Sequence, residues 1–161
     1  MPDSTLQPIV DVSVAGDMVL QVVWKDGTRY RVDLSTLIRE SQVLAPLRAK
    51  DMFDQVSVGL GGYSLDWPGD LELGSDQVFR WGAEQAGDFM PSAEFVTWRG
   101  GMGLTQEKAA AALGLSKRMI AYYESGEKPI PKTVRLACIG LEALGARHGG
   151  EPGGSVRGGV S

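Results

Sequence analysis

The sequence predicts an α+β domain followed by an all-helical domain, in a chain of 161 residues. Three observations support this prediction. Apolar residues alternate along three short segments at the start of the chain, as they do in half-buried strands. Over residues 104–126 the apolar residues follow helical spacing instead, on both sides of a glycine. The last segment, residues 149–161, is rich in glycine and poor in apolar side chains, and we expect it to be disordered.

We expect the first domain, residues 1–88, to begin with a three-stranded antiparallel meander. Residues 8–14 alternate between apolar and polar side chains, which is typical of a half-buried strand, and residues 15–17 supply a turn. Residues 18–24 form a more fully apolar second strand. Asp26-Gly27 is a strong signal for a two-residue hairpin turn, and it leads into a third strand over residues 28–34.

Short helices and a second hairpin complete this domain. The sequence predicts one short helix capped by Ser35, a second from Pro46 to about Phe53, and a third from Ser75 to about Ala86. Residues 56–58 are expected to pair with residues 65–67 across a turn at Gly61-Gly62. We expect the side chains of Trp24 and Trp67 to lie in the core.

Carboxylates gather around one turn of this domain: Asp66, Asp70, Glu72 and Asp76. Such a cluster could hold a hard cation, but its spacing does not match a calcium loop, and aspartate is common in turns for backbone reasons. The chain has one histidine, His148, and one cysteine, Cys138, which excludes a zinc cluster, a histidine-based triad and an internal disulfide. We therefore expect no metal site, no cofactor and no enzymatic activity.

Residues 104–126 predict two short helices joined by a tight corner. Thr105 and Ser116 stand at N-cap positions, and Gly126 stands where the second helix should end. Gly114 occupies the corner, where the backbone needs a positive φ. The helices would pack on each other through small and apolar side chains: Ala109, Ala110, Leu113, Leu115, Ile120 and Tyr123.

The outward side of the second helix contains no acid. Lys117, Arg118, Ala121 and Tyr122 lie between its cap and its apolar stripe. An ordinary helical hairpin in a core explains the apolar positions equally well. It does not explain the outward side, because a merely solvated helix usually carries charges of both signs. The pattern therefore favours a helix that contacts a nucleic acid.

The motifs LTQE at residues 104–107, LGLS at 113–116 and YESG at 123–126 resemble the helix-turn-helix domains of the lambda-repressor and Cro type, the Xre family. The resemblance covers about residues 91–145. It implies a compact all-helical domain, residues 89–148, that binds operator DNA as a dimer. The paired Gly100-Gly101 departs from the family pattern and should shorten the first helix. Relatives continue with a fifth helix, whereas glycine-rich sequence follows Gly145 here.

The resemblance also implies a role for individual positions. The start and outward side of the second motif helix, residues 117–125, would meet base edges: Ser116, Lys117, Arg118, Ala121 and Tyr122. A second set would contact DNA phosphates: Thr105, Gln106, Lys128 and Lys132. For Lys132 a solvated surface charge is an equal alternative. Arg99 and Glu124 would form an ion pair that braces the recognition helix.

The first domain resembles a small bacterial domain of unknown function. The motifs that carry this resemblance are WKDG at residues 24–27, VDLS at 32–35, LAPL at 44–47 and LDWP at 65–68. The resemblance implies no established activity. Such domains occur alone or fused to helix-turn-helix domains, so the first domain is expected to supply dimerisation, effector sensing or a protein partner.

Charge is distributed unevenly along the chain. Residues 1–90 contain 7 Lys and Arg against 14 Asp and Glu, a net charge of −7, whereas residues 91–161 contain 9 against 6, a net charge of +3. DNA association depends on the local patch that faces the duplex, so the positive half suits it. Apolar runs are too short to span a membrane, and no secretory signal is visible, so we expect a bacterial cytoplasmic protein.

These observations predict a sequence-specific DNA-binding transcriptional regulator, acting as a repressor and a homodimer. An antitoxin-like protein, whose N-terminal domain binds a toxin or another protein partner, is the alternative. A pure protein-interaction module with this fold and no role on DNA is a third interpretation. Steep loss of affinity with salt would separate it from the first, because only a DNA reader displaces counterions from phosphates.

Overall fold

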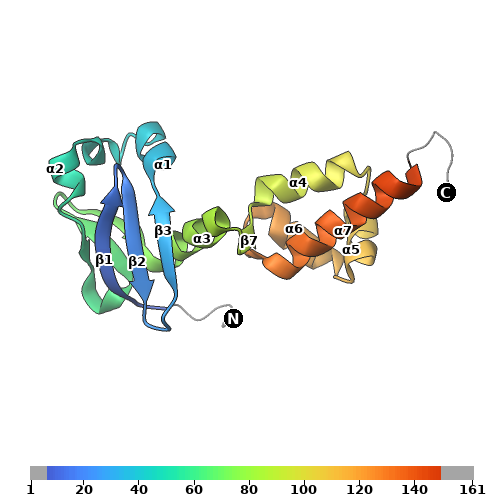
Figure 1. The fold of residues 1–161 in the computed structure, drawn as a ribbon, viewed down its shortest axis with the longest axis horizontal. Coiled ribbons are helices and arrows are strands. Elements are labelled where there is room, and N and C mark those ends of the chain that lie inside the picture. Colours follow the sequence, from blue (N-terminus) through green and yellow to red (C-terminus); the bar gives the residue numbers. More distant parts are fainter. Residues whose placement is uncertain (1–6, 150–161) are drawn as a thin grey trace. The chain divides into compact units, whose positions relative to one another are not determined.

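The computed structural model describes residues 7–149, and the chain divides into two compact units between Ala86 and Gly87. The predicted fold class is confirmed, because antiparallel strands with short helices make up the first unit and helices dominate the second (Figure 1). The boundary lies two residues before the predicted end of the first domain at residue 88. Each unit has its own apolar core.

The first sheet is an antiparallel meander in the order β1-β2-β3, with bounds Ile9–Gly16, Val19–Trp24 and Arg29–Asp33. The first turn comes later than predicted, because Gly16 pairs with Val19 and the turn consists of Asp17 and Met18, whose φ is 58°. The second loop has three residues, 25–27, instead of two. The Trp24 N–H donates to the Thr28 carbonyl oxygen at 2.8 Å, and Gly27 takes a φ of 93°, a three-residue hairpin geometry.

The remaining elements of this unit follow the predicted order, with two corrections. Ser35 is the first residue of its helix and not the cap, because its N–H and Oγ both donate to Asp33 Oδ1, at 2.9 and 2.7 Å, and Leu34 takes the N-cap position. The single helix predicted from Pro46 to about Phe53 is divided into a 3₁₀ turn and a short α-helix. Its helices are α1 (Ser35–Glu40), the 3₁₀ turns η1 (Ala45–Arg48) and η2 (Leu60–Gly62), α2 (Lys50–Phe53) and α3 (Ser75–Ala86). A second sheet contains β4 (Ser57–Val58), β5 (Ser64–Trp67) and β6 (Leu71–Gly74). Strand β6 was not predicted, and it places Glu72 directly opposite Asp66. In the described part of the chain, no group of three or more His, Cys, Asp or Glu side chains is placed to hold a metal ion.

The core of the first unit lies between the meander, α1, β5 and α3. Trp24 and Trp67 are buried in it, as predicted, at 1% and 4% exposure. Helix α3 is tied to β3 by Gln85, whose amide accepts from the Asp33 N–H at 2.8 Å and donates to the Asp33 carbonyl oxygen at 2.9 Å. A Cβ at Gly82 would lie 2.6 Å from that of Tyr30, so this close packing requires glycine.

The second unit contains four helices among the described residues: α4 (Ser92–Gly101), α5 (Gln106–Leu113), α6 (Lys117–Ser125) and α7 (Lys132–Gly149). Two short strands, β7 (Phe89–Met90) and β8 (Ile130–Pro131), pair antiparallel and were not predicted. The core is built on Phe95, Trp98, Ile120 and Tyr123. Burial raises the pKa of the Cys138 thiol to about 11, with smaller contributions from the nearby Glu94 and Glu142. The thiol is therefore uncharged at neutral pH and packs in the core as an apolar side chain.

Two boundaries in the second unit differ from expectation. Helix α4 continues through Gly100 and Gly101, because the Met102 N–H still donates to the Trp98 carbonyl oxygen at 3.0 Å. Helix α7 continues past Gly145 to Gly149 instead of ending there. The rest of the predicted disordered tail lies outside the described residues. No helix in the described part of the chain is long and apolar enough to cross a membrane.

Candidate nucleic-acid interface

The corner between α5 and α6 is fixed by two hydrogen bonds that run back to the last turn of α5. Gly114 takes the left-handed conformation, with φ 72° and ψ 31°. The Leu115 N–H donates to the Ala110 carbonyl oxygen at 2.9 Å, and the Gly114 N–H donates to that of Ala111 at 3.4 Å. This pair of bonds is the Schellman arrangement, which ends a helix in one defined direction. The entry direction of α6 is therefore set by the backbone.

Both motif helices are capped by the residues that the sequence analysis named. Thr105 Oγ1 accepts from the Lys108 N–H, and Ser116 Oγ accepts from the Met119 N–H, both at 3.1 Å. Gly126 ends α6 with a φ of 84°. Such a cap contributes about 1 kcal/mol of stability. The two helices are therefore held in place at their ends as well as at the corner.

Helix α6 presents different chemistry on its two sides. Ile120 and Tyr123 are buried in the core, at 0% and 5% exposure. The predicted base-contacting residues lie on the other side, where Tyr122 is half-buried and four residues are exposed: Ser116, Lys117, Arg118 and Ala121. Within residues 7–149, no carboxylate forms an ion pair with Lys117 or Arg118. The outward side of α6 is thus cationic and accessible.

Arg99 and Glu124 lie together as predicted and join α4 to α6. The Arg99 Nε donates to Glu124 Oε2, and its Nη2 donates to Oε1 at 3.1 Å. The remaining Nη1 donates to the Leu104 carbonyl oxygen at 2.9 Å. Two parallel bonds to one carboxylate give the pair a fixed geometry as well as a charge attraction.

Gln106 belongs to the same network, a contact that was not predicted from the sequence. Its Nε2 donates to Glu124 Oε1 at 3.1 Å, so Glu124 holds α4, the start of α5 and the end of α6 at once. An amide nitrogen carries two hydrogens. One of them serves Glu124, and the other is available to a phosphate oxygen, which keeps the predicted phosphate contact feasible.

The ionisation of Glu124 depends on this network. Burial disfavours its charged form, but the hydrogen bonds from Arg99 and Gln106 and the charge of Arg99 outweigh burial and hold its pKa below the ordinary 4.5. Its stabilising contribution is therefore complete above about pH 4.5 and is lost as the pH falls through the lowered pKa.

We expect Glu124→Gln to unfold at a lower temperature than wild type at neutral pH, with the gap closing below about pH 4.5. The gap closes because protonated Glu124 in the wild type and the glutamine in the variant are both uncharged. Thermal unfolding followed by circular dichroism at several pH values measures it. A gap that stays constant down to acidic pH would show that the carboxylate charge contributes nothing.

The other predicted phosphate contacts are also accessible. Thr105 is exposed at the start of α5, where backbone N–H groups and the helix dipole favour an anion. Lys128 and Lys132 are exposed beyond α6. The Lys128 Nζ lies 5.4 Å from the centre of the Tyr122 ring. A predicted phosphate-contacting residue and a predicted base-contacting residue therefore lie next to each other here.

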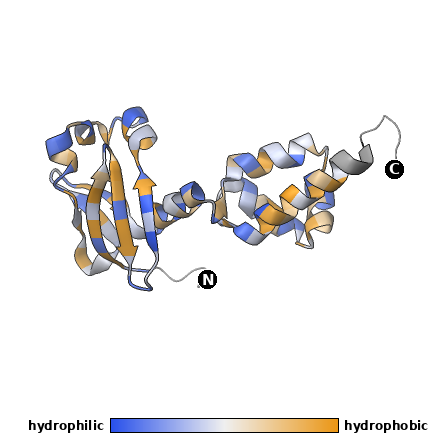
Figure 2. Cartoon of the chain, in the orientation of Figure 1, coloured by the Kyte–Doolittle hydropathy of each residue, from blue (hydrophilic) through white to orange (hydrophobic). Residues whose placement is uncertain are grey.

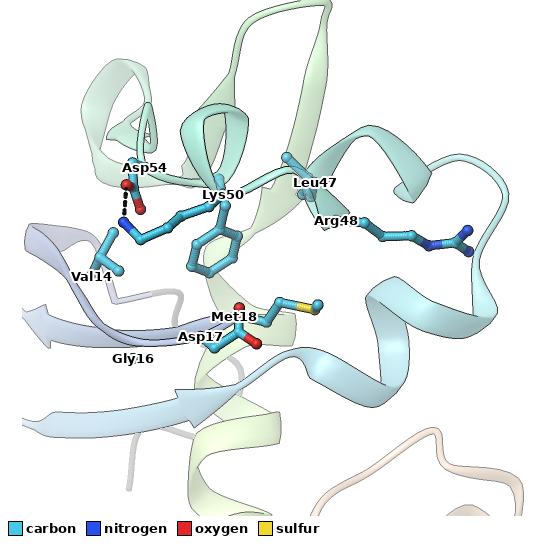
Figure 3. A pocket seen from close by; sticks show the side chains of 9 residues that line it. Val14, Gly16, Asp17, Met18, Leu47, Arg48, Lys50 and Asp54 are labelled. Carbon is cyan, nitrogen blue, oxygen red and sulfur yellow. Dashed lines mark hydrogen bonds and ion pairs between the residues drawn. The ribbon is translucent and has the colours of Figure 1, made fainter.

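The first unit contains a pocket of about 360 Å³ at the β1–β2 turn (Figure 3). Its lining includes the apolar side chains Val14, Met18, Leu47 and Phe53, together with Asp17, Lys50 and Asp54. The Lys50 Nζ and Asp54 Oδ2 form an ion pair at 2.7 Å. A pocket of this size and lining can accept a small molecule with an apolar part. The rings of Trp24 and Trp67 are buried in the core and therefore offer no surface to a ligand.

The two capped helices, the glycine corner and the accessible α6 define a helix-turn-helix protein. Residues 97–137 match the family described as helix-turn-helix, and residues 9–84 match the protein family of unknown function DUF2442. Both resemblances stated from the sequence are thereby confirmed. The matches cover the same two regions that the fold separates.

Among solved structures, the chain is similar to a candidate DNA-binding protein from Nitrosomonas europaea ATCC 19718, with 33% identity and a TM-score of 0.54. The match covers 89% of this chain and 91% of that one. No curated protein matches the chain. The chain therefore belongs to the family of the Nitrosomonas protein, and it joins a DUF2442 domain to an Xre-type helix-turn-helix domain.

Proposed function

We propose that this protein is a sequence-specific DNA-binding transcriptional regulator that acts as a repressor in the bacterial cytoplasm. The accessible, acid-free side of α6 supports this proposal most directly. Lys117 and Arg118 stand at its start, free of acidic partners among the described residues and on a helix whose direction is fixed. The similarity to a candidate DNA-binding protein supports it independently. The role is one of binding, without catalysis or a cofactor.

In the proposed complex α6 lies in the major groove. Arg118 or Lys117 donates to guanine O6 and N7, and Tyr122 or Ala121 contacts a thymine methyl group. Ser116 donates to a base edge or to the backbone. Backbone contacts come from Thr105, Gln106, Lys128 and Lys132, and they fix the register of α6 on the duplex.

A two-fold dimer would set two α6 helices about 34–36 Å apart on a near-palindromic operator. Occupation of a promoter by this dimer would block transcription. The first unit would tune this binding, and the pocket in Figure 3 is a candidate site for a small effector.

Salt dependence tests the proposal. Two protomers bring Lys128 and Lys132 to about four phosphates, so log affinity should fall with log salt with a slope of about −3.6. Lys128→Ala, which removes one cation from each protomer, should reduce the slope by roughly 1.8. A mobility-shift search with genomic fragments finds the operator, and anisotropy titrations at several salt concentrations give the slope. A slope near zero would reject DNA binding in favour of a protein-interaction module, and no preference among fragments would reject sequence-specific reading.

An antitoxin-like function is the second candidate, and one observation in the first unit favours it. The Leu60 side chain is 98% exposed, and Tyr63 beside it is 52% exposed. An apolar side chain held out in this way suits a protein partner. Co-expression with the products of adjacent genes, comparing wild type with Leu60→Ser, tests it. Capture of a neighbouring gene product that the variant loses would favour the antitoxin-like role.

A further inference from the structure

One broad face of α7 is apolar and exposed. Leu136, Ile139 and Leu144 are 56%, 52% and 49% exposed. The small residues of this face are also exposed: Ala137, Gly140 and Ala143. Residues three and four apart share a helix face. The opposite side of α7 packs into the core through Val134, Cys138 and Leu141, and Figure 2 shows the apolar character of this helix.

Gly140 lies in the middle of this face, and no contact within the described chain accounts for a glycine at this position. A Cβ built at this position would meet nothing within 4 Å. Glycine inside a helix is less stable than alanine, and no neighbouring atom of the described chain requires it. Glycine is favoured where another backbone must come close. Its place among exposed apolar side chains leaves room for a second backbone to come close at this point.

The face is symmetric about Gly140. Leu136 and Leu144 stand four residues to either side, and Ala137 and Ala143 stand three residues to either side. In an antiparallel pair related by a two-fold axis, each residue faces the position at the same distance beyond the centre. Leucine then faces leucine, alanine faces alanine, and the two glycines meet at the axis, which lets the helices approach closely.

The charge of the face also fits a copy of itself. Between Thr133 and Leu144 the charged residues are Arg135, which pairs with Glu94 at 3.4 Å, and Glu142, which acts on the Cys138 thiol of the inner side. The apolar face itself carries no charge. A second copy therefore brings no like charge to bury, whereas DNA or a strongly charged protein would find nothing to complement.

We infer that α7 pairs with α7 of a second copy of this chain, antiparallel and centred on Gly140. A contact over twelve residues is about 18 Å long. One helix face of that length buries less area than the ~800 Å² per partner in a standard stable interface. The dimer is therefore reversible. This interface supplies the pairing that the proposed regulator needs and in this sense rests on the proposed function.

A charge exchange across the interface tests the pairing and its direction. Leu136→Glu and Leu144→Lys should each raise the dissociation constant of the full-length dimer about tenfold or more, because each buries an unpaired charge against leucine. The double variant should return to within about threefold of wild type, since opposite charges then face each other twice. Sedimentation equilibrium measures these constants, and circular dichroism verifies the fold.

In a parallel pair residue 136 would face its own copy, so the double variant would bring like charges together and dimerise worst. That result overturns the inference. A wild-type chain that stays monomeric at every concentration, or a dimer that neither single variant weakens, also overturns it.

Gly140→Ala provides a second test with a matched control. Gly100 in α4 is also helical and exposed, and a Cβ there also meets nothing within 4 Å. Gly100→Ala and Gly140→Ala should both raise the unfolding temperature. Only Gly140→Ala should weaken the dimer, about threefold or more, because its methyl group stands at the axis. A dimer that Gly140→Ala leaves unchanged overturns the close contact at Gly140.

DNA binding of the wild type is measured in parallel. A chain that pairs through α7 but binds no genomic fragment overturns the proposed function and leaves the interface intact. A chain that binds DNA but keeps its dimer in Leu136→Glu overturns the interface and leaves the proposed function intact.

Discussion

Replacing Lys117 and Arg118 together by alanine is expected to weaken operator binding about 100-fold or more, because each specific base contact contributes ~1–3 kcal/mol. Both side chains are exposed, and neither caps α6, so the variant should unfold at the wild-type temperature. Anisotropy titrations with the operator fragment at one fixed salt concentration give the affinity ratio. Binding to unrelated duplex should fall much less.

A matched variant in the first unit controls for the loss of charge. Lys25 and Arg29 are exposed on the β2–β3 hairpin, and Lys25→Ala plus Arg29→Ala removes the same two charges from the chain. This control should bind the operator within about twofold of wild type, since exposed charges that make no contact with the duplex are screened by salt. If both variants lose affinity equally, net charge governs binding and α6 does not read the sequence.

Glu124→Ala is expected to destabilise the second unit by about 2 kcal/mol, because it leaves the partly buried Arg99 fork and the Gln106 amide without their acceptor. The side chains of Arg99 and Glu124 are 23% and 12% exposed, so the cost should exceed that of a surface pair, ~0–1 kcal/mol. Thermal unfolding should shift down by roughly 8–16 °C for a unit of this size.

The exposed pair Lys50–Asp54 is the control, since Lys50 is 83% exposed. Lys50→Ala should leave the unfolding temperature unchanged within experimental error. Arg99→Lys keeps a positive charge but loses the two-pronged geometry, and it should recover only part of the stability. If Arg99→Ala and Glu124→Ala both unfold as the wild type does, the network does not brace α6.

Local chemistry made much of this fold predictable. Thr105, Ser116, Gly114 and Gly126 act within a few residues of their own backbone, so their positions follow from the sequence. Strand alternation located the meander for the same reason. The loop at residues 25–27 is one residue longer than predicted, because a glycine after aspartate suits both two- and three-residue hairpins.

Features that depend on distant partners could not be predicted. The strands β7 and β8 have two residues each, too few to show any periodicity. The contact between Gln106 and Glu124 joins side chains 18 positions apart. The extension of α7 past Gly145 runs against the helix-breaking tendency of glycine. The roles of the predicted DNA-contacting residues remain predictions, whereas the pairing of Arg99 with Glu124 is observed.

The hydrogen bond from Gln106 to Glu124 has a mechanical consequence for DNA recognition. The Gln106 amide, which is expected to contact a phosphate, is hydrogen-bonded to the carboxylate that positions α6. The distance between the phosphate contact and the base-contacting side of α6 is therefore fixed. A duplex whose major groove is too narrow or too wide for this fixed distance cannot make the phosphate contact and the base contacts at once. The protein would then discriminate by the sequence-dependent stiffness of base-pair steps that no side chain touches.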